Sequence, residues 1–354
     1  MADPGVTQWI REEVRRQPAY RVKSADYSVK LNQNESPWDW TEDLKKEISS
    51  RIISSPWNRY PELIPLQLRT KLAQSLNIEL TQIVIGKGSN EVLQALATAT
   101  LTKGDTVCTL SPTFAVYDMV AEQRGAVVLA SLLSDRFEPN EVDLKKKAVQ
   151  AKVIILCNPN SPTGTLIPVE VVEEVAEASP GLVVVDEAYI DFSGVTALPL
   201  VSDHANLVVT RTFSKAFALA GFRLGYAVMS VDLATEVQKC LLPFNIDMPS
   251  AVAGEVLLDH ADFVAERART VVRERDWLID SLNDLPRVKA WPSHANFFLL
   301  ETSARSAATF DGLTRRGILV RDVSSYPLCG NVVRVTVGTP EENQKLLEGV
   351  RALL

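Results

Sequence analysis

The segments Leu182-Val-Val-Val-Asp-Glu-Ala-Tyr189 and Asn206-Leu-Val-Val-Thr-Arg-Thr-Phe-Ser-Lys215 decide the fold of this chain. Both contain an unbroken run of aliphatic residues without polar alternation, which predicts strands that are buried on both faces. Each run then ends at polar and charged residues. Ligands of open α/β sheets bind at the carboxyl ends of the strands, so we expect Asp186 and Lys215 to lie at a binding site.

Four more runs of the same kind precede these two segments, and longer helical patterns separate them. Because a parallel strand needs a crossover helix to return the chain, the alternation predicts an α/β fold with a mostly parallel sheet flanked by helices. The four runs are Ile83–Ile85, Val107–Leu110, Val127–Leu129 and Val153–Cys157.

The C-terminal third shows a different order of predicted helices and strands, which indicates a second, smaller domain. Residues 250–285 show the apolar spacing of one or two long amphipathic helices, which we expect to connect the two domains. Strands and helices then follow in an α+β order. We predict a large domain over residues 47–251, and a small domain formed by residues 1–46, the first forty of them an irregular arm, together with residues 252–354.

Composition excludes several classes of function. The net charge is -7, and the basic residues are scattered, so nothing predicts nucleic-acid binding. No stretch is apolar enough for a signal peptide or a membrane helix, and four cysteines without a C-x-x-C spacing favour a soluble, cytoplasmic protein. The three histidines match no metal-binding spacing, so we expect no metal.

Lys215 and Asp186 carry the reactive chemistry. A lysine among apolar side chains loses the hydration of its ammonium, so its pKa falls and the amine becomes reactive. Taken alone, such a lysine is more often a solvated residue at a helix end, and such an aspartate is more often a helix cap. The functional interpretation of Lys215 and Asp186 therefore depends on the motifs that surround them in the sequence.

Two further strand ends add a candidate anion site and a shaped loop. After Ile85 the chain reads Gly86-Lys-Gly-Ser-Asn-Glu91, where glycine and a helix N-terminus favour a phosphate, although the last glycine of a dinucleotide fingerprint is missing. After Cys157 it reads Asn158-Pro-Asn-Ser-Pro-Thr-Gly164, which is typical of a turn.

Together these motifs resemble, over nearly the whole chain, the fold-type I pyridoxal-phosphate aminotransferases, and most closely the histidinol-phosphate aminotransferase family. The resemblance also rests on an arm motif, on a short Arg-Tyr-Pro motif and on a closing motif near the C-terminus. These motifs are Leu31-Asn-Gln-Asn-Glu-Ser-Pro37, Arg59-Tyr-Pro61, Asp186–Tyr189, Thr212–Arg223 and Arg334–Thr339.

The resemblance implies a role for each residue around the cofactor, pyridoxal 5'-phosphate. Lys215 would carry it as a Schiff base and move the substrate proton, Asp186 would pair with the ring nitrogen, and Tyr189 would bond the phenolic oxygen. Phe114 would lie over the ring. The phosphate would be held by Gly88, Ser89, Asn90, Thr212, Ser214 and Arg223, and by Tyr60 from the partner subunit of a homodimer.

One position departs from the family pattern, in which an asparagine precedes the second proline of the loop and bonds the ring hydroxyl. Here that residue is Ser161. Its hydroxyl is a shorter donor, so the contact would be weaker, bridged by water, or taken over by Asn160.

The resemblance also implies the substrate pocket, formed by Tyr20, Asn34, Arg321 and Arg334. Two arginines suit the carboxylates of glutamate in one half-reaction and a phosphate in the other. The plain alternative is that Arg321 is a surface charge paired with Asp322 or Asp311. We predict transamination between histidinol phosphate and 2-oxoglutarate.

Other activities compete with this prediction. An aromatic-amino-acid aminotransferase and a threonine-phosphate decarboxylase share all the cofactor residues. A nicotinamide dehydrogenase lacks its fingerprint here, and a non-enzymatic regulator would need a DNA-binding module that the sequence does not show.

Overall fold

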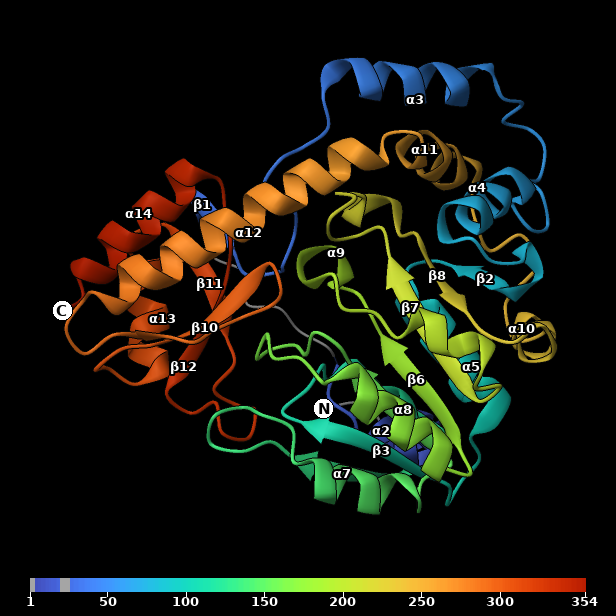
Figure 1. The fold of residues 1–354 in the computed structure, drawn as a ribbon, viewed down its shortest axis with the longest axis horizontal. Helices are drawn as coiled ribbons and strands as arrows, with labels where there is room; N and C mark the ends of the chain where they lie inside the picture. Colours follow the sequence, from blue (N-terminus) through green and yellow to red (C-terminus); the bar gives the residue numbers. More distant parts are fainter. Residues whose placement is uncertain (1–3, 20–25) are drawn as a thin grey trace.

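A computed structural model describes residues 4–19 and 26–354, and these fold around two β-sheets (Figure 1). The larger sheet has seven strands in the order β2-β8-β7-β6-β5-β3-β4. All neighbours are parallel except that β8 lies antiparallel between β7 and β2. Its strands are β2 (Ile83–Gly86), β3 (Thr106–Ser111), β4 (Val127–Leu132), β5 (Val153–Cys157), β6 (Leu182–Asp186), β7 (Leu207–Thr212) and β8 (Gly225–Val228).

Helices cover both faces of this sheet, as the unbroken aliphatic runs predicted. Successive side chains of a strand point to opposite faces, so Val184 and Val208 enter one apolar core while Val185 and Val209 enter the other. One face carries α5 (Ser89–Thr100), α6 (Val116–Gln123) and α10 (Val231–Gln238). The other carries α4 (Leu66–Leu76), α7 (Glu141–Ala148), α8 (Val169–Ala178) and α11 (Met248–Leu258).

The smaller sheet has five strands in the order β1-β11-β12-β10-β9 and belongs to an α+β unit. The prediction of strands and helices in this region is confirmed. The elements are β1 (Val29–Leu31), β9 (Lys289–Ala290), β10 (Phe297–Glu301), α13 (Ser306–Thr314), β11 (Ile318–Asp322), β12 (Val332–Thr336) and α14 (Pro340–Arg351).

The long helix α12 (Ala261–Asn283) connects the two parts. It packs on α14, β9 and β10 on one side and on the short helix α9 (Ile190–Ser193) on the other, and Figure 1 shows it running from the red C-terminal part toward α11. A break at Asp259 and His260 separates it from α11, so the helical region is two helices. α3 (Glu42–Ser54) packs on α11. No helix in the described part of the chain is long and apolar enough to span a membrane.

Two local predictions need correction. The first forty residues are not only an irregular arm: α1 (Pro4–Thr7) and α2 (Glu12–Arg15) form there, and β1 pairs in parallel with β11. The antiparallel strand β8 was missed because it contains Gly225 and Ala227, which are poor strand formers, in place of an aliphatic run. The domain limits at residues 47 and 251 stay predictions.

Candidate active site

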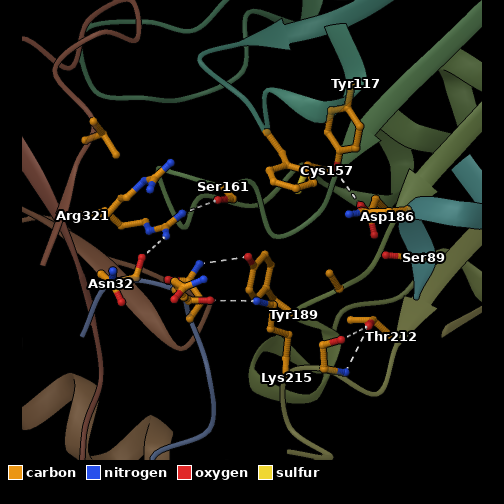
Figure 2. Close-up of a pocket in the computed structure, with 18 of the residues that line it drawn as sticks. Asn32, Ser89, Tyr117, Cys157, Ser161, Asp186, Tyr189, Thr212, Lys215 and Arg321 are labelled. Atoms are coloured by element: carbon orange, nitrogen blue, oxygen red, sulfur yellow. Dashed lines mark hydrogen bonds between the residues drawn. The ribbon is translucent and has the colours of Figure 1, made fainter. Parts of the chain in front are cut away.

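The polar strand ends meet in one pocket between the two sheets (Figure 2). β6 ends at Asp186, β7 ends at Thr212, β5 ends at Cys157, and α5 begins at Ser89 directly after β2. The small sheet contributes Arg321 and Arg334 from β11 and β12. Thirteen of the predicted site residues line this pocket: Asn34, Ser89, Asn90, Phe114, Ser161, Asp186, Tyr189, Thr212, Ser214, Lys215, Arg223, Arg321 and Arg334.

Lys215 stands among other cations. Its amine donates to the backbone oxygen of Gln33 at 3.1 Å. Burial lowers the pKa of Lys215 to about 8, and the positive charges of Arg334 and Arg223 act in the same direction. A minority of the amine is therefore neutral near physiological pH, far more than for an ordinary lysine, and the neutral form is the one that attacks carbonyl carbon.

Asp186 is a buried carboxylate whose two oxygens already accept hydrogen bonds from the protein. The Tyr117 hydroxyl donates to Oδ2 at 2.7 Å, and the Thr210 hydroxyl donates to Oδ1 at 3.0 Å. Burial raises the pKa of Asp186, while these donors and the backbone N–H of Ala188 act against burial. The carboxylate keeps acceptor capacity for one more N–H donor.

Tyr189 lies next to Asn34 and Ser161. Asn34 Nδ2 donates to the Tyr189 hydroxyl at 3.0 Å, and Arg334 Nη1 donates to Ser161 Oγ at 3.1 Å. Burial raises the pKa of Tyr189 to about 12, so its hydroxyl stays protonated and can donate to an oxygen.

Hydroxyl groups, a guanidinium and a helix N-terminus form the anion site at the other end of the pocket. Ser214 N–H donates to Thr212 Oγ1 at 3.1 Å, and Arg223 Nη1 donates to Ser214 Oγ at 3.2 Å. Two glycines allow the close approach. A Cβ on Gly88, whose φ is 73°, would lie 2.7 Å from Arg223 Nη2, and a Cβ on Gly225 would lie 2.3 Å from the backbone nitrogen of Ser89.

The pocket has more cationic than acidic lining residues, which distinguishes it from an ordinary polar cleft. Among its lining residues, all of which belong to the described ranges, Lys215, Arg223, Arg321 and Arg334 are cationic and Asp186 is the one acid. Such a set favours a ligand with several negative charges. The hydroxyl and guanidinium donors, the Lys215 amine and the Asp186 carboxylate are the groups that the phosphate, the aldehyde and the ring nitrogen of pyridoxal phosphate would need.

Arg321 and Arg334 face each other as cross-strand neighbours of β11 and β12. In the described part of the chain no carboxylate lies within ion-pair distance of Arg321, so the alternative in which Asp322 or Asp311 pairs with it fails there. Two like charges directly opposite each other repel, and a bound anion would remove that cost.

Three predicted residues do not line the pocket, and a fourth is not among the described residues. Asn160 is turned away from the pocket: its oxygen accepts from Thr113 at 2.7 Å, and its Nδ2 donates to the Pro112 oxygen and to Thr163. Both N–H groups of its amide are therefore engaged by the protein itself. Gly88 lies just behind the lining residues, and Tyr60 lies on the surface. Tyr20 falls outside the described residues.

Sequence reasoning missed Tyr117 and Cys157, which also line the pocket. Tyr117 lies in the first turn of α6, three residues after Phe114, and its backbone N–H donates to the Phe114 oxygen. This one-turn spacing from a predicted site residue could have revealed it. Cys157 ends a predicted strand, as Asp186 does. Asn32, Gln33, Ala188, Val323 and Tyr326 complete the lining.

Acids and histidine also gather at one surface site, away from the pocket. Glu173, Glu177 and His204 bring one ligand atom each within 4.8 Å of one another. They precede β7, whereas the pocket lies beyond its carboxyl end. This group therefore contributes nothing to the chemistry of the pocket.

Comparisons with known proteins agree with the geometry. The model of the family "Aminotransferase class I and II" matches residues 27–350. The histidinol-phosphate aminotransferase of Thermoanaerobacter pseudethanolicus is 36% identical, over 98% of both chains, and that of Thermococcus kodakarensis is 38% identical, over 94% of this chain and 95% of the other. The crystal structure of histidinol-phosphate aminotransferase from Sinorhizobium meliloti in complex with pyridoxal-5'-phosphate shares the fold with a TM-score of 0.84, at 24% identity over 93% of this chain and 92% of that one.

Proposed function

This chain belongs to the aminotransferase class I and II family, and from that premise we propose that it transfers an amino group between histidinol phosphate and 2-oxoglutarate. As a member of the family it is a pyridoxal-phosphate-dependent aminotransferase with the fold-type I architecture. The proposed reaction is a step of histidine biosynthesis and follows a ping-pong course, in which the two substrates use one pocket in turn.

The observation that carries the proposal is the pair Arg321 and Arg334. Histidinol phosphate has a phosphate but no carboxylate, whereas 2-oxoglutarate and glutamate have two carboxylates. A guanidinium forms paired hydrogen bonds to either anion. Because the two arginines face each other across β11 and β12, both can reach the same bound anion.

The residues around the cofactor would hold it and prepare it for reaction. Pyridoxal phosphate, when bound, supplies an aldehyde carbon that bonds to amines and a ring that withdraws electrons. Ser89, Asn90, Thr212, Ser214 and Arg223 would bind its phosphate. Phe114 would cover one face of its ring.

Three side chains would take part in the proton and charge transfers. Lys215 would attach the cofactor through its amine and, once released, would accept the proton from the substrate's α-carbon. Asp186 would keep the ring nitrogen protonated, and Tyr189 would donate to the ring's phenolic oxygen. Ser161 would complete the contacts at that oxygen, with Asn160 serving the loop instead.

We also propose that the active form is a homodimer to which Tyr60 contributes across the interface. Tyr60 is 82% exposed, stacks on Phe244 with ring centroids 4.8 Å apart, and does not line the pocket of its own chain. Trp57, at 73%, and Leu242, at 77%, are exposed as well. Large apolar side chains as exposed as these support an interface with a second copy.

Mixing inactive variants tests the shared site. Combining Tyr60→Ala chains with Lys215→Ala chains gives hybrid dimers in which one site has both residues, so at random exchange about a quarter of the sites should be intact. Arg223→Ala mixed with Lys215→Ala is the matched control, because both lesions belong to one chain's site. Equal results from both mixtures, with subunit exchange shown by mass labelling, would contradict the proposal.

A cytoplasmic location completes the proposal. The four cysteines are free thiols, and three of them are buried, which suits a reducing compartment.

A panel of donors tests the reaction itself. Purified protein is incubated with histidinol phosphate, phenylalanine, tyrosine or threonine phosphate, each with 2-oxoglutarate, and glutamate formation is measured. We expect histidinol phosphate to have the highest kcat/KM. Preference for phenylalanine or tyrosine would favour an aromatic-amino-acid aminotransferase, and release of CO₂ from threonine phosphate would favour the decarboxylase.

A further inference from the structure

Tyr117 contacts both Asp186 and Phe114, to which the proposed mechanism gives separate roles. It lies in the first turn of α6, is 1% exposed, and its hydroxyl donates to Asp186 Oδ2 at 2.7 Å (Figure 2). The edge of its ring meets the Phe114 ring at an interplanar angle of 85°, with the centroids 5.5 Å apart. One side chain therefore contacts both the carboxylate proposed for the ring nitrogen and the ring proposed to cover the cofactor.

The hydroxyl of Tyr117 is a dependable donor to this carboxylate. Burial raises the pKa of Tyr117 well above its usual value, so the phenol keeps its proton. A donor aimed at a buried carboxylate stabilises the charged form, and loss of one such bond leaves the carboxylate short of a partner. Thr210 holds the other oxygen, so Asp186 is held from two sides and its direction is fixed.

We propose that Tyr117 is a positioning residue for the reaction, whose hydroxyl keeps Asp186 charged and aimed at the cofactor's ring nitrogen and whose ring holds Phe114 over the cofactor. The inference rests on the proposed roles of Asp186 and Phe114. It assigns two separable contributions to one residue. Removal of the hydroxyl weakens the electron withdrawal by the cofactor, whereas removal of the ring also loosens the cofactor.

The variant Tyr117→Phe isolates the hydroxyl, because it retains the contact with Phe114. We expect the single-turnover rate to fall by about 10- to 100-fold, the scale of a lost hydrogen bond to a charged group, while KM changes little. The visible absorption of the loaded protein should also shift, because the protonation of the ring nitrogen changes. Tyr117→Leu removes the ring too and should additionally weaken cofactor binding in an absorbance titration.

A double-mutant cycle shows whether the effect passes through Asp186. In an Asp186→Asn background there is no carboxylate to keep charged, so adding Tyr117→Phe should cost less than about threefold. Tyr226→Phe is the matched control: it removes the hydroxyl of another buried tyrosine, which interacts with Arg211 and lies outside the pocket lining, and it should leave the absorption unchanged. Thr210→Val removes the second donor to Asp186 and should act in the same direction as Tyr117→Phe.

Two outcomes would overturn the inference. One is a Tyr117→Phe protein whose absorption and single-turnover rate equal those of the wild type. The other is an equal loss with and without Asp186, which would mean that Tyr117 acts by another route. Failure of the proposed function looks different, because the wild-type protein would then form no coloured complex with pyridoxal phosphate or would turn over no amino donor.

Discussion

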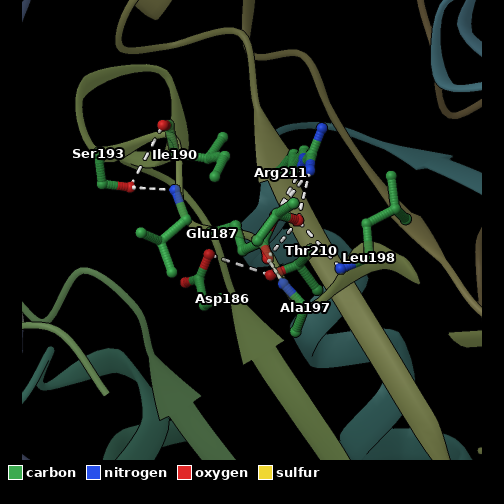
Figure 3. A network of polar contacts seen from close by, with 10 residues as sticks. Asp186, Glu187, Ile190, Ser193, Ala197, Leu198, Thr210 and Arg211 are labelled. Atoms are coloured by element: carbon green, nitrogen blue, oxygen red, sulfur yellow. Dashed lines mark hydrogen bonds and ion pairs between the residues drawn. The ribbon is translucent and has the colours of Figure 1, made fainter. Parts of the chain in front are cut away.

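Two polar clusters stand side by side at the ends of β6 and β7, and they differ in how their charges are matched. Asp186 and Thr212 face the pocket of Figure 2, whereas their neighbours Glu187 and Arg211 face a second cluster, shown in Figure 3. Successive residues of a strand point to opposite faces, so one pair of strands supplies both clusters.

The second cluster satisfies its own charges. Glu187 is 1% exposed, accepts from Arg211 Nε at 2.9 Å and from the backbone N–H of Ala197 at 2.6 Å, and also accepts from the hydroxyl of Thr196. One acid and one base are thus paired, with hydrogen bonds on all sides. The pocket instead combines four cations with one acid. The comparison teaches that a buried acid and base paired with each other hold a fold together, whereas an excess of cations around a cavity indicates an anionic ligand.

The largest effect should follow from removing the amine of Lys215 from the cation-rich pocket. Lys215→Ala should abolish turnover, because no other amine lines the pocket, while the melting temperature should stay equal or rise, because a cation disfavoured by burial is gone. Borohydride reduction of the loaded wild type, followed by peptide mapping, should label Lys215. A label on a different lysine would refute the assignment.

Breaking the matched cluster should act on stability instead. Glu187→Gln leaves the Arg211 charge buried without its partner, so the free energy of unfolding should fall by about 3 kcal/mol. Activity per folded molecule should stay within about threefold of wild type, since Glu187 does not face the pocket. Urea unfolding and titration of active sites measure the two quantities. A stable but inactive Glu187→Gln protein would contradict the prediction that Glu187 contributes to stability rather than to activity.

Replacing Arg321 tests whether the excess of cations in the pocket serves the substrate. Arg321→Ala should lower kcat/KM for histidinol phosphate and glutamate by about 100-fold, the scale of a lost charged hydrogen-bonding partner, and should affect phenylalanine far less. Arg315→Ala, an exposed arginine of the same domain, is the control and should change neither. Equal losses for all donors would indicate structural damage, and no loss would place Arg321 outside the substrate contacts.

The same two strands show how far sequence reasoning reaches. Aliphatic runs with polar ends predicted β6, β7 and the positions of Asp186 and Lys215 at or just beyond their carboxyl ends, because burial on both faces leaves a strong local pattern. The partner of Asp186 could not be predicted this way, since Tyr117 is 69 residues away in sequence and meets it only through packing of α6 on the sheet. Asn160 and Ser161 are neighbours, yet only the folded loop decides which of them faces the pocket.

The smallest predicted effect concerns the pH at which the pocket accepts its cofactor, and it follows from the crowding of cations around Lys215. Only the neutral amine attacks the aldehyde, and the pKa of Lys215 is lowered to about 8. The rate of colour formation by the cofactor-free protein should therefore rise about tenfold per pH unit below pH 8 and level off above it.

Replacing Arg334 tests the cause of this pH dependence, because after burial its charge is the largest influence on the pKa of Lys215. A positive neighbour favours the neutral amine, so Arg334→Ala should raise the pKa and move the plateau to higher pH. Arg315→Ala should leave it in place. A wild-type rate that still rises toward pH 10 would show that the ammonium of Lys215 is not destabilised. The excess of cations in the pocket would then have no effect on the reactivity of Lys215.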